Sequence, residues 1–254
     1  MKGLILKDDS RYQYTEKHLQ SKGYFLDSQT KPENLDFVIF PFMENVDETI
    51  YNNEFFASLR KNMPVFSGIR STYLTEKCAE NGIKYHVMMD DNSVKVKNAV
   101  PTSEGVIAYL VHGLIRTVEN SKILVIGYGV CGRDLSLRLK SLGAHVYALV
   151  RNKEKEQLAH SDSITPIYLN ELCTFDAIIN TVPENVLTDE MLKNTENALL
   201  IDIASKPYGF NMELALKLNS KSALLPGIPG KSSPQTAGEI LGEYIDSVLR
   251  GTTK

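Results

Sequence analysis

Lys122-Ile-Leu-Val-Ile-Gly127-Tyr-Gly129-Val-Cys-Gly132-Arg is the stretch that decides the fold, because an apolar strand runs directly into a Gly-x-Gly-x-x-Gly turn. Leu135, Leu139 and Leu142 follow on one helical face, so the turn opens a helix. In such a turn the first glycine permits a tight bend, the second lets a pyrophosphate approach the backbone, and the third lets the helix pack close to the strand. Free N–H groups at the start of the helix then bind phosphate. The stretch therefore predicts a dinucleotide site.

Strand-like and helical segments alternate on both sides of this turn. From the turn onward, we predict helices at 130–142 and 153–159 and strands at 122–126, 144–150, 164–167, 176–181, 198–203 and 222–225. Before the turn, helical or polar stretches such as 11–22 and 53–61 separate short apolar runs at 3–6, 37–40, 64–66 and 83–86. Alternation of this kind is typical of α/β proteins with parallel sheets. We therefore expect two Rossmann-like, doubly wound parallel-sheet domains.

A long helix is predicted to join these two domains. Val100-Pro101-Thr-Ser-Glu104 comes before apolar residues at helical spacing, at positions 107, 110, 111, 114, 115 and 118. Proline is common in the first turn of a helix, so we place the start of the linking helix at this proline. The expected organisation is a flavodoxin-like or Rossmann-like substrate domain at 1–100, a linking helix at 101–119, a dinucleotide domain at 120–233, and a helix at 234–254 that packs back on the first domain.

The composition excludes several classes of protein. The chain has 254 residues with 28 basic and 31 acidic side chains, so its net charge of -3 favours neither nucleic acid nor an anionic membrane. No apolar run reaches the roughly 18 residues that span a bilayer, and the first residues do not form a signal peptide, so we expect a cytoplasmic protein. Cys78, Cys131 and Cys173 are widely spaced, and the five histidines lack metal-ligand spacing. We expect reduced thiols and no metal site.

The type of dinucleotide is read from the end of the second strand of the dinucleotide domain. An acid about 20 residues beyond the glycines binds the ribose hydroxyls of NAD, whereas a cation accommodates the 2′-phosphate of NADP. This chain has Arg151-Asn152-Lys153 there and no acid, which favours NADP. The alternative is that Arg151 and Lys153 are solvated charges at a strand end. The predicted cofactor-binding residues are Gly127, Tyr128, Gly129, Val130, Cys131, Gly132, Arg151, Asn152, Lys153, Asn180, Thr181, Val182 and Pro183, the last four for the nicotinamide ribose.

Two further loops after predicted strands carry polar groups for a substrate. Ser205 and Lys206 lie in a loop whose small residues would let a flat ring approach the backbone. The Gly/Pro-rich loop at 225–238 brings an ammonium group and hydroxyls to the start of the last helix, where N–H groups and the helix dipole favour an anion. The predicted carboxylate contacts in this loop are Lys231, Ser232, Ser233 and Thr236. The alternative is that Ser233 and Thr236 only cap the helix.

Four motifs, in this order and spacing, are similar to those in the family of the A subunit of dipicolinate synthase, dehydrogenases of endospore-forming bacteria. They are Gly-Tyr-Gly-Val-Cys-Gly at 127–132, Asn-Thr-Val-Pro at 180–183, Ile-Asp-Ile-Ala-Ser-x-Pro at 201–207 and Pro-Gly-Ile-Pro-Gly-Lys-x-x-Pro-x-Thr-Ala-Gly at 226–238. Asp-Asp-Ser-Arg-Tyr at 8–12, Phe-Pro-Phe at 40–42 and Pro-Thr-Ser-Glu-Gly at 101–105 extend the resemblance to nearly the whole chain. The chain departs from the family at Val130, where Arg is common, and at 207–210, where a Pro-Gly-Gly-type segment is common.

This resemblance implies oxidation of dihydrodipicolinate, a lysine-pathway intermediate, to dipicolinate during sporulation, with NADP+ as hydride acceptor. It also implies that a second, flavoprotein-like subunit is the partner, and that the protein is located in the mother cell. The substrate is a planar dianion, so we expect Lys231 and the hydroxyls of its loop to bind one carboxylate and Arg11 the other. Lys231 and Glu104 are the predicted catalytic residues, Glu104 as a base whose pKa would be raised on the apolar face of the linking helix. The alternative for Glu104 is a simple charge near a helix N-terminus.

Two other functions stay open at this point. The domain order also resembles D-2-hydroxyacid dehydrogenases, which need a catalytic histidine with a carboxylate partner and an arginine in the nucleotide domain. No histidine follows His160, so we find no equivalent. The other possibility is a non-catalytic NADP-binding subunit that supports activity only with a partner. The chain could also form a homo-oligomer.

Overall fold

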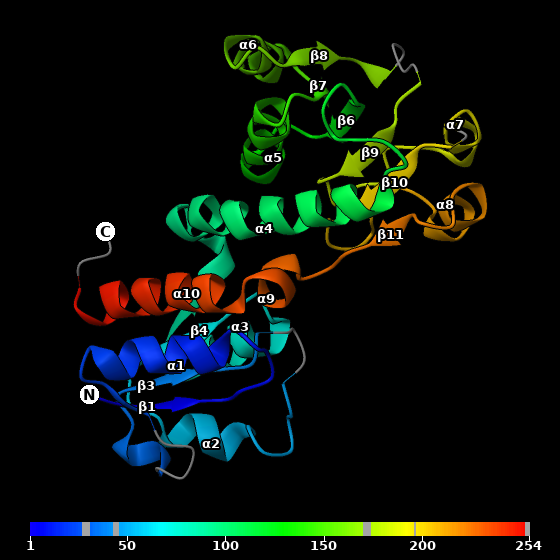
Figure 1. The fold of residues 1–254 in the computed structure, drawn as a ribbon. Helices are drawn as coiled ribbons and strands as arrows, with labels where there is room; N and C mark the ends of the chain where they lie inside the picture. Colours follow the sequence, from blue (N-terminus) through cyan, green and yellow to red (C-terminus); the bar gives the residue numbers. More distant parts are fainter. Residues whose placement is uncertain (27–30, 43–45, 170–173, 196, 252–254) are drawn as a thin grey trace. The chain divides into compact units, whose positions relative to one another are not determined.

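A computed structural model describes residues 1–26, 31–42, 46–169, 174–195 and 197–251. These residues form two compact units (Figure 1). The first unit comprises Met1–Asn98 and Ser233–Lys254, and the second comprises Ala99–Ser232. The expectation of two parallel-sheet α/β domains is confirmed.

The first unit is built on a five-stranded parallel sheet with the order β2-β1-β3-β4-β5. This order is that of flavodoxin-like doubly wound sheets. Strands β1, β3, β4 and β5 lie within a residue of the predicted apolar runs, and two-residue β2 was not predicted. The strands are β1 (Lys2–Ile5), β2 (Phe25–Leu26), β3 (Phe37–Ile39), β4 (Pro64–Ser67) and β5 (Lys84–Val87), and the helices are α1 (Tyr12–Ser21), α2 (Asn53–Ser58), α3 (Thr72–Glu80) and α10 (Pro234–Leu249), with 3-10 turns η1 (Pro32–Asn34) and η2 (Met88–Asp90).

The C-terminal helix α10 belongs to the first unit, as predicted, and it lies beside α1 (Figure 1). Two glycines let the helices approach closely. A Cβ atom on Gly238 would lie 2.3 Å from the Arg11 carbonyl oxygen, and one on Gly242 would lie 2.8 Å from the His18 ring. The Thr15 hydroxyl donates a hydrogen bond to the Gly238 carbonyl oxygen at 2.9 Å. Helix α10 is therefore part of the core of the first unit.

The second unit carries a six-stranded parallel sheet with the order β11-β10-β9-β6-β7-β8. Counted from β6, this is the Rossmann order, with apolar clusters on both faces of the sheet. Each strand lies within the range predicted for it. The strands are β6 (Lys122–Ile126), β7 (His145–Leu149), β8 (Thr165–Ile167), β9 (Ala177–Asn180), β10 (Leu199–Asp202) and β11 (Ala223–Leu224), and the helices are α5 (Val130–Ser141), α6 (Lys153–Ser161), α7 (Asp189–Lys193), α8 (Met212–Leu218) and α9 (Ile228–Ser232).

The linking helix differs from the prediction at both ends. Helix α4 runs over Asn92–Gly113, so Pro101 lies inside it, and the boundary between the two units also falls inside it. The helix starts early because the Asp91 carboxylate accepts hydrogen bonds from the N–H groups of Ser93 and Val94, at 2.8 and 3.2 Å, as a helix cap does. It also ends before the predicted apolar stripe does, which leaves Ile115 96% exposed.

Among the described residues, none of the helices combines the length and the apolar character that crossing a membrane requires. Cys78 and Cys131 are free thiols. Cys173 lies outside the described residues.

Candidate functional site

The glycine turn of the second unit has the geometry that a dinucleotide needs. Gly127 has a φ of +92°, which favours glycine, and a Cβ atom there would lie 2.4 Å from Val182 Cγ2. A Cβ atom on Gly132 would lie 2.2 Å from the Gly127 carbonyl oxygen, so the third glycine allows the helix to pack on the turn. A Cβ atom on Gly129 would have no neighbour within 4 Å among the described residues. The second glycine therefore leaves open space where a phosphate would approach.

The start of helix α5 adds hydrogen-bond donors to this space. Gly129 is the N-cap residue of α5, and in the described part of the chain no side chain caps the first turn. The first N–H groups of a helix have no partner within the helix, so they can bind a pyrophosphate. The turn follows β6, which pairs with β7 on one side and β9 on the other, so it lies at the topological switch point of the sheet. Ligands of doubly wound sheets bind at this position.

Tyr128, between the first two glycines, is directed into the protein and not toward a cofactor. It is 3% exposed, and its hydroxyl donates to Asp162 Oδ2 at 2.9 Å. Burial and this hydrogen bond raise the pKa of Tyr128 well above its ordinary value. The predicted cofactor contact is therefore wrong for this side chain, and the residue can offer only its backbone.

Asp162 forms hydrogen bonds both with the glycine turn, at Tyr128, and with the helix that follows it, at Arg133. Besides Tyr128, it accepts two hydrogen bonds from Arg133, Nε to Oδ2 at 2.7 Å and Nη2 to Oδ1 at 2.9 Å, and its carbonyl oxygen accepts one from Lys140. The hydrogen bond from Arg133 holds the pKa of Asp162 below its ordinary value. Sequence reasoning missed this residue. Its one local signal was an acid directly after a helix, where the dipole disfavours it unless a cation pairs with it.

Replacement of this carboxylate, Asp162→Asn, is expected to weaken dinucleotide binding by about threefold to tenfold, since losing part of a charge-assisted bond amounts to roughly 1 kcal/mol. Because its pKa is lowered in the folded state, Asp162 contributes stability above the unfolded-state pKa of about 3.9, and this contribution is lost as the pH falls through the folded-state pKa. The stability difference between wild type and variant should therefore be constant near neutral pH and narrow in acid. Fluorescence titration and urea unfolding measure both effects.

Asp134→Asn is the matched control for this prediction, because Asp134, like Asp162, pairs with an arginine of α5, in its case Arg138. Equal dinucleotide affinities for the Asp162 variant, the control and the wild type would contradict the role of Asp162.

The other residues predicted to contact the cofactor near the turn lie at its surface or pack against it, and their contacts with a cofactor stay predictions. Val130 is 38% exposed and Cys131 is partly buried in the first turn of α5. Burial raises the pKa of the Cys131 thiol, so it is a poor nucleophile at neutral pH. Thr181 and Val182 lie against the turn, and the Thr181 hydroxyl donates to the Ile126 carbonyl oxygen at 2.8 Å. The second unit thus brings the loop after β9 to the glycine turn.

Asn180 does not have the predicted ribose contact. It is fully buried, its amide Nδ2 donates to Val182 O at 2.8 Å and to Asp202 Oδ1 at 3.0 Å, and its Oδ1 accepts from the Val182 N–H. Asp202, also buried, accepts from the N–H groups of Ala204 and Gly209 at 2.9 and 2.6 Å. Because all of these groups are used within the protein, the pair shapes the loops after β9 and β10. Pro183 is exposed beside them.

The residues predicted to select NADP are on the surface. The Arg151 side chain is 84% exposed and lies 4.0 Å from the Glu184 carboxylate. The Asn152 side-chain oxygen accepts from the Lys155 N–H at 2.9 Å and caps α6, and Lys153 is exposed. The oxygen of Asn152 is therefore committed to the helix, while the two cations are free to meet a phosphate. Their role stays a prediction.

Glu104 does not occupy the environment predicted for a buried base. Its side chain is 57% exposed, and its Oε1 lies 3.5 Å from Nη1 of Arg138. The expectation of desolvation on an apolar helix face is wrong, because Glu104 lies on the solvent side of α4.

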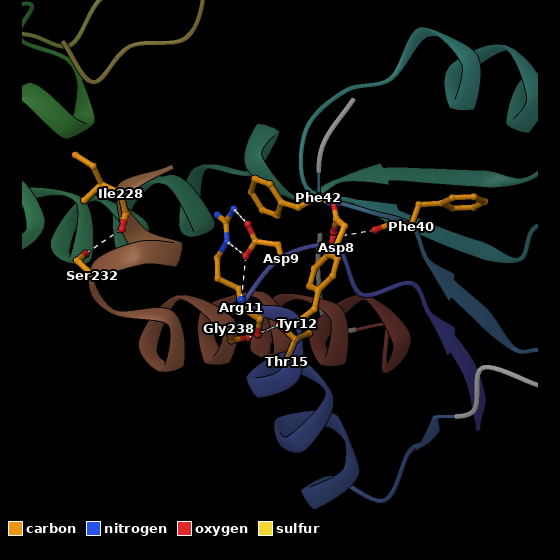
Figure 2. Close-up of polar contacts among 10 residues, drawn as sticks. All are labelled: Asp8, Asp9, Arg11, Tyr12, Thr15, Phe40, Phe42, Ile228, Ser232 and Gly238. Carbon is orange, nitrogen blue, oxygen red and sulfur yellow. Dashed lines mark hydrogen bonds and ion pairs between the residues drawn. The ribbon is translucent and has the colours of Figure 1, made fainter. Parts of the chain in front are cut away.

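The predicted carboxylate loop contains the short helix α9 and, directly after it, the boundary between the two units. Lys231 is exposed at the end of α9, and the Ser232 hydroxyl donates to the Ile228 carbonyl oxygen at 2.9 Å (Figure 2). Ser233, the first residue of the returning segment, is the N-cap residue of α10 but makes no side-chain capping bond, so the capping alternative is wrong for it. Thr236 is exposed, as are Ser205 and Lys206 after β10.

Arg11 lies at the corresponding edge of the sheet of the first unit. It is 4% exposed, and its Nε and Nη2 donate to the two oxygens of Asp9, each at 2.7 Å (Figure 2). Burial opposes ionisation of Asp9, but the hydrogen bonds from Arg11 outweigh it and hold the pKa of Asp9 below its ordinary value. Arg11 is thus a buried, oriented cation, not a mobile surface arginine.

Comparisons with known proteins agree with this geometry. The family model of the D-isomer specific 2-hydroxyacid dehydrogenase NAD binding domain matches residues 102–204. The A subunit of dipicolinate synthase from Bacillus subtilis (strain 168) is 28% identical over 233 residues, which cover 85% of this chain and 78% of that protein. The resemblance expected from the motifs is confirmed. The second unit is therefore similar, over residues 102–204, to the NAD binding domain of these dehydrogenases, and this similarity supports a nicotinamide dinucleotide as cofactor.

Solved structures support the same fold. The A subunit of dipicolinate synthase from Bacillus halodurans has a TM-score of 0.89 at 24% identity, with 98% of this chain and 97% of that chain covered. A D-lactate dehydrogenase from Salmonella has a TM-score of 0.69 at 13% identity, with 100% and 98% covered. The fold is therefore shared by dehydrogenases of different substrates, and the fold alone does not identify the substrate.

Proposed function

We propose that this chain oxidises dihydrodipicolinate to dipicolinate with NADP+ as hydride acceptor, together with a second, flavoprotein-like subunit. The observation that carries the proposal is the open space at Gly129, at the switch point of a sheet whose domain matches a dehydrogenase family. The similarity to the A subunit of dipicolinate synthase supports the substrate, and that name, which describes one subunit of an enzyme, supports the partner.

The chain's own residues would do three things in this reaction. In the second unit, the N–H groups at the start of α5 would hold the pyrophosphate and the Lys231 ammonium would bind a carboxylate. In the first unit, Arg11, with the hydroxyls of Ser233 and Thr236, would offer donors to a substrate carboxylate. When bound, the nicotinamide accepts the hydride. The substrate loses one hydride and one proton and becomes aromatic, so the protein mainly has to position two rings and allow one proton to leave. The proposal needs no buried base, in keeping with the exposed position of Glu104.

The test is turnover by the complete system. The chain is mixed with a purified flavoprotein-like partner subunit, dihydrodipicolinate and NADP+, and the formation of NADPH and of dipicolinate is followed. We expect both products in equal amounts. No turnover with the partner present, but normal NADP binding, would instead favour a non-catalytic binding subunit.

The preference for NADP rests on Arg151 and Lys153 and is tested separately. Arg151→Ala is expected to weaken NADP binding by about tenfold and to leave NAD binding unchanged, because a charged hydrogen bond to the 2′-phosphate contributes roughly 1.5 kcal/mol or more. Glu184→Gln should strengthen NADP binding, because it removes the carboxylate beside Arg151. Fluorescence titration with both dinucleotides measures these changes.

Arg116→Ala is the matched control for this prediction, because Arg116 is an exposed arginine of the same unit, 3.5 Å from Asp176. Equal affinity of the wild type for NAD and NADP would contradict the assignment.

A second candidate, a D-2-hydroxyacid dehydrogenase, is favoured by the family match over residues 102–204. Against it, no histidine follows His160, and His160 itself is exposed on α6. Reduction of 2-oxo acids with NADH or NADPH by the chain alone would favour this candidate over the first.

A further inference from the structure

Figure 2 shows an arginine, two acids and an aromatic ring gathered at one edge of the first sheet. Asp8, Asp9 and Arg11 follow β1, and Phe42 follows β3. Strand β1 pairs with β2 on one side and with β3 on the other, so this edge is the switch point of a doubly wound sheet. Ligands bind at such points, outside the carboxyl ends of the strands. The first unit therefore presents a ligand-binding position of its own.

The guanidinium of Arg11 is held on two sides. Asp9 binds Nε and Nη2 through both carboxylate oxygens at 2.7 Å, and its Oδ1 also accepts the Arg11 backbone N–H at 2.9 Å. The Arg11 Cζ atom lies 3.4 Å from the centroid of the Phe42 ring, so the guanidinium stacks on the ring. A fork to a carboxylate and a stack on a ring fix both the plane and the rotation of the group.

The ring is itself fixed by neighbouring residues. The Phe42 N–H donates to Asp8 Oδ1 at 2.8 Å, so consecutive acids hold the two partners of the stack. The Tyr12 hydroxyl donates to the Phe40 carbonyl oxygen at 2.8 Å, and the Tyr12 and Phe42 rings lie 6.3 Å apart. The whole arrangement is thus tied to β1, α1 and the end of β3.

This pairing leaves part of the guanidinium unused. An arginine has five N–H donors, and the fork to Asp9 takes one from Nε and one from Nη2. Within the part of the chain that the structure describes, Nη1 has no hydrogen-bond acceptor. This nitrogen is also not fully buried. It points away from the Asp9 carboxylate in Figure 2. A planar carboxylate is the acceptor that matches such an edge.

We propose that Asp9 and Phe42 are positioning residues that preset the free edge of Arg11 for a ligand carboxylate, with Asp8 fixing Phe42. A buried ion pair contributes little net stability compared with apolar residues of similar volume. Ligand recognition, not stability of the fold, therefore accounts for the position of the Arg11–Asp9 ion pair at this edge of the sheet. This inference rests on the proposed function for the identity of the ligand, a planar pyridine or dihydropyridine dicarboxylate.

The test measures binding of pyridine-2,6-dicarboxylate to the full chain by calorimetry, together with thermal stability. Arg11→Lys keeps the charge but loses the fork and the stack, so we expect about tenfold or more weaker binding. Asp9→Asn and Phe42→Leu should each weaken binding by about threefold to tenfold, while NADP affinity stays constant. The double variant Arg11→Met with Asp9→Leu should lose binding yet keep or raise the melting temperature.

Arg60→Lys is the matched control, because Arg60 is an exposed arginine paired with Asp36 in the same unit. Wild-type chain that does not bind the dicarboxylate, or Arg11 and Asp9 variants that bind it like Arg60→Lys, would overturn the inference. If binding depends on Arg11 but dihydrodipicolinate is not turned over, the inference is supported and the proposed function is not. If turnover is unchanged in Arg11→Lys, the proposed function is supported and the inference is not.

Discussion

Gly129→Ala is expected to remove dinucleotide binding from a chain that folds normally. A Cβ atom at this position meets no described atom within 4 Å, and the backbone, with φ of -84°, is in a region open to any residue. As an N-cap residue, alanine is less favourable than glycine by no more than about 1 kcal/mol. The added methyl group does, however, fill the space that a pyrophosphate needs beside the N–H groups of α5. We expect NADP affinity to fall by at least about tenfold.

Gly132→Ala gives the contrasting result and serves as the comparison variant. Its Cβ atom would lie 2.2 Å from the backbone oxygen of Gly127, so either the turn or the helix must shift. Both stability and binding should then fall, the first by about 1 to 3 kcal/mol, as in overpacked cores. Thermal unfolding with and without NADP separates the two variants. A Gly129 variant that binds NADP as well as the wild type would refute the placement of the pyrophosphate.

Gly238→Ala is expected to destabilise the first unit, although helix propensity predicts the opposite. Replacing glycine by alanine inside a helix stabilises it by up to about 1 kcal/mol when there is room. At Gly238 there is none, since the Cβ atom would lie 2.3 Å from the Arg11 carbonyl oxygen and 3.0 Å from the Thr15 nitrogen. These are backbone atoms of α1 and of its N-cap residue, which cannot rotate away. The overpacking should cost about 1 to 3 kcal/mol and lower the melting temperature on the order of 5–15 °C.

Gln235→Ala on the exposed side of α10 is the control for Gly238→Ala, and it should change the melting temperature by little. Calorimetry measures both variants. A Gly238 variant as stable as the wild type would mean that α10 does not pack on α1 as closely as described.

Local patterns in the sequence carried most of the strand and helix assignments. All strands of the two sheets except the two-residue β2 were found, because parallel strands buried on both faces are continuous apolar runs. Helix α4 was placed wrongly because a proline signal was preferred over the cap at Asp91, which bonds to Ser93 and Val94. Helices α7, α8 and α9 were missed because five to seven residues are too few for a helical period to appear.

In the candidate site, too, some features were predictable from local sequence and others were not. The glycine turn was predictable because its requirements are met by neighbours in sequence, with Gly127, Gly129 and Gly132 each needed for the path of one short loop. Glu104 was misjudged because the apolar face assumed for its helix is not the buried face: Val111 and Ile115 are 59% and 96% exposed, whereas Val106 and Leu110 are fully buried. Asn180 was taken for a ribose contact because the sequence does not reveal that Asp202, 22 residues away, uses its amide.

The sequence by itself determined the two α/β domains, the order of the strands after the turn, the dinucleotide turn and the returning helix, because apolar periods and glycine spacings are local properties. Only the tertiary structure decided which polar groups are already engaged. Asp162 holds Tyr128 from 34 residues away, and Asp8 holds Phe42 at the same separation. Such pairs form because the crossovers of parallel sheets bring segments that are distant in sequence into contact, and no local pattern records that contact.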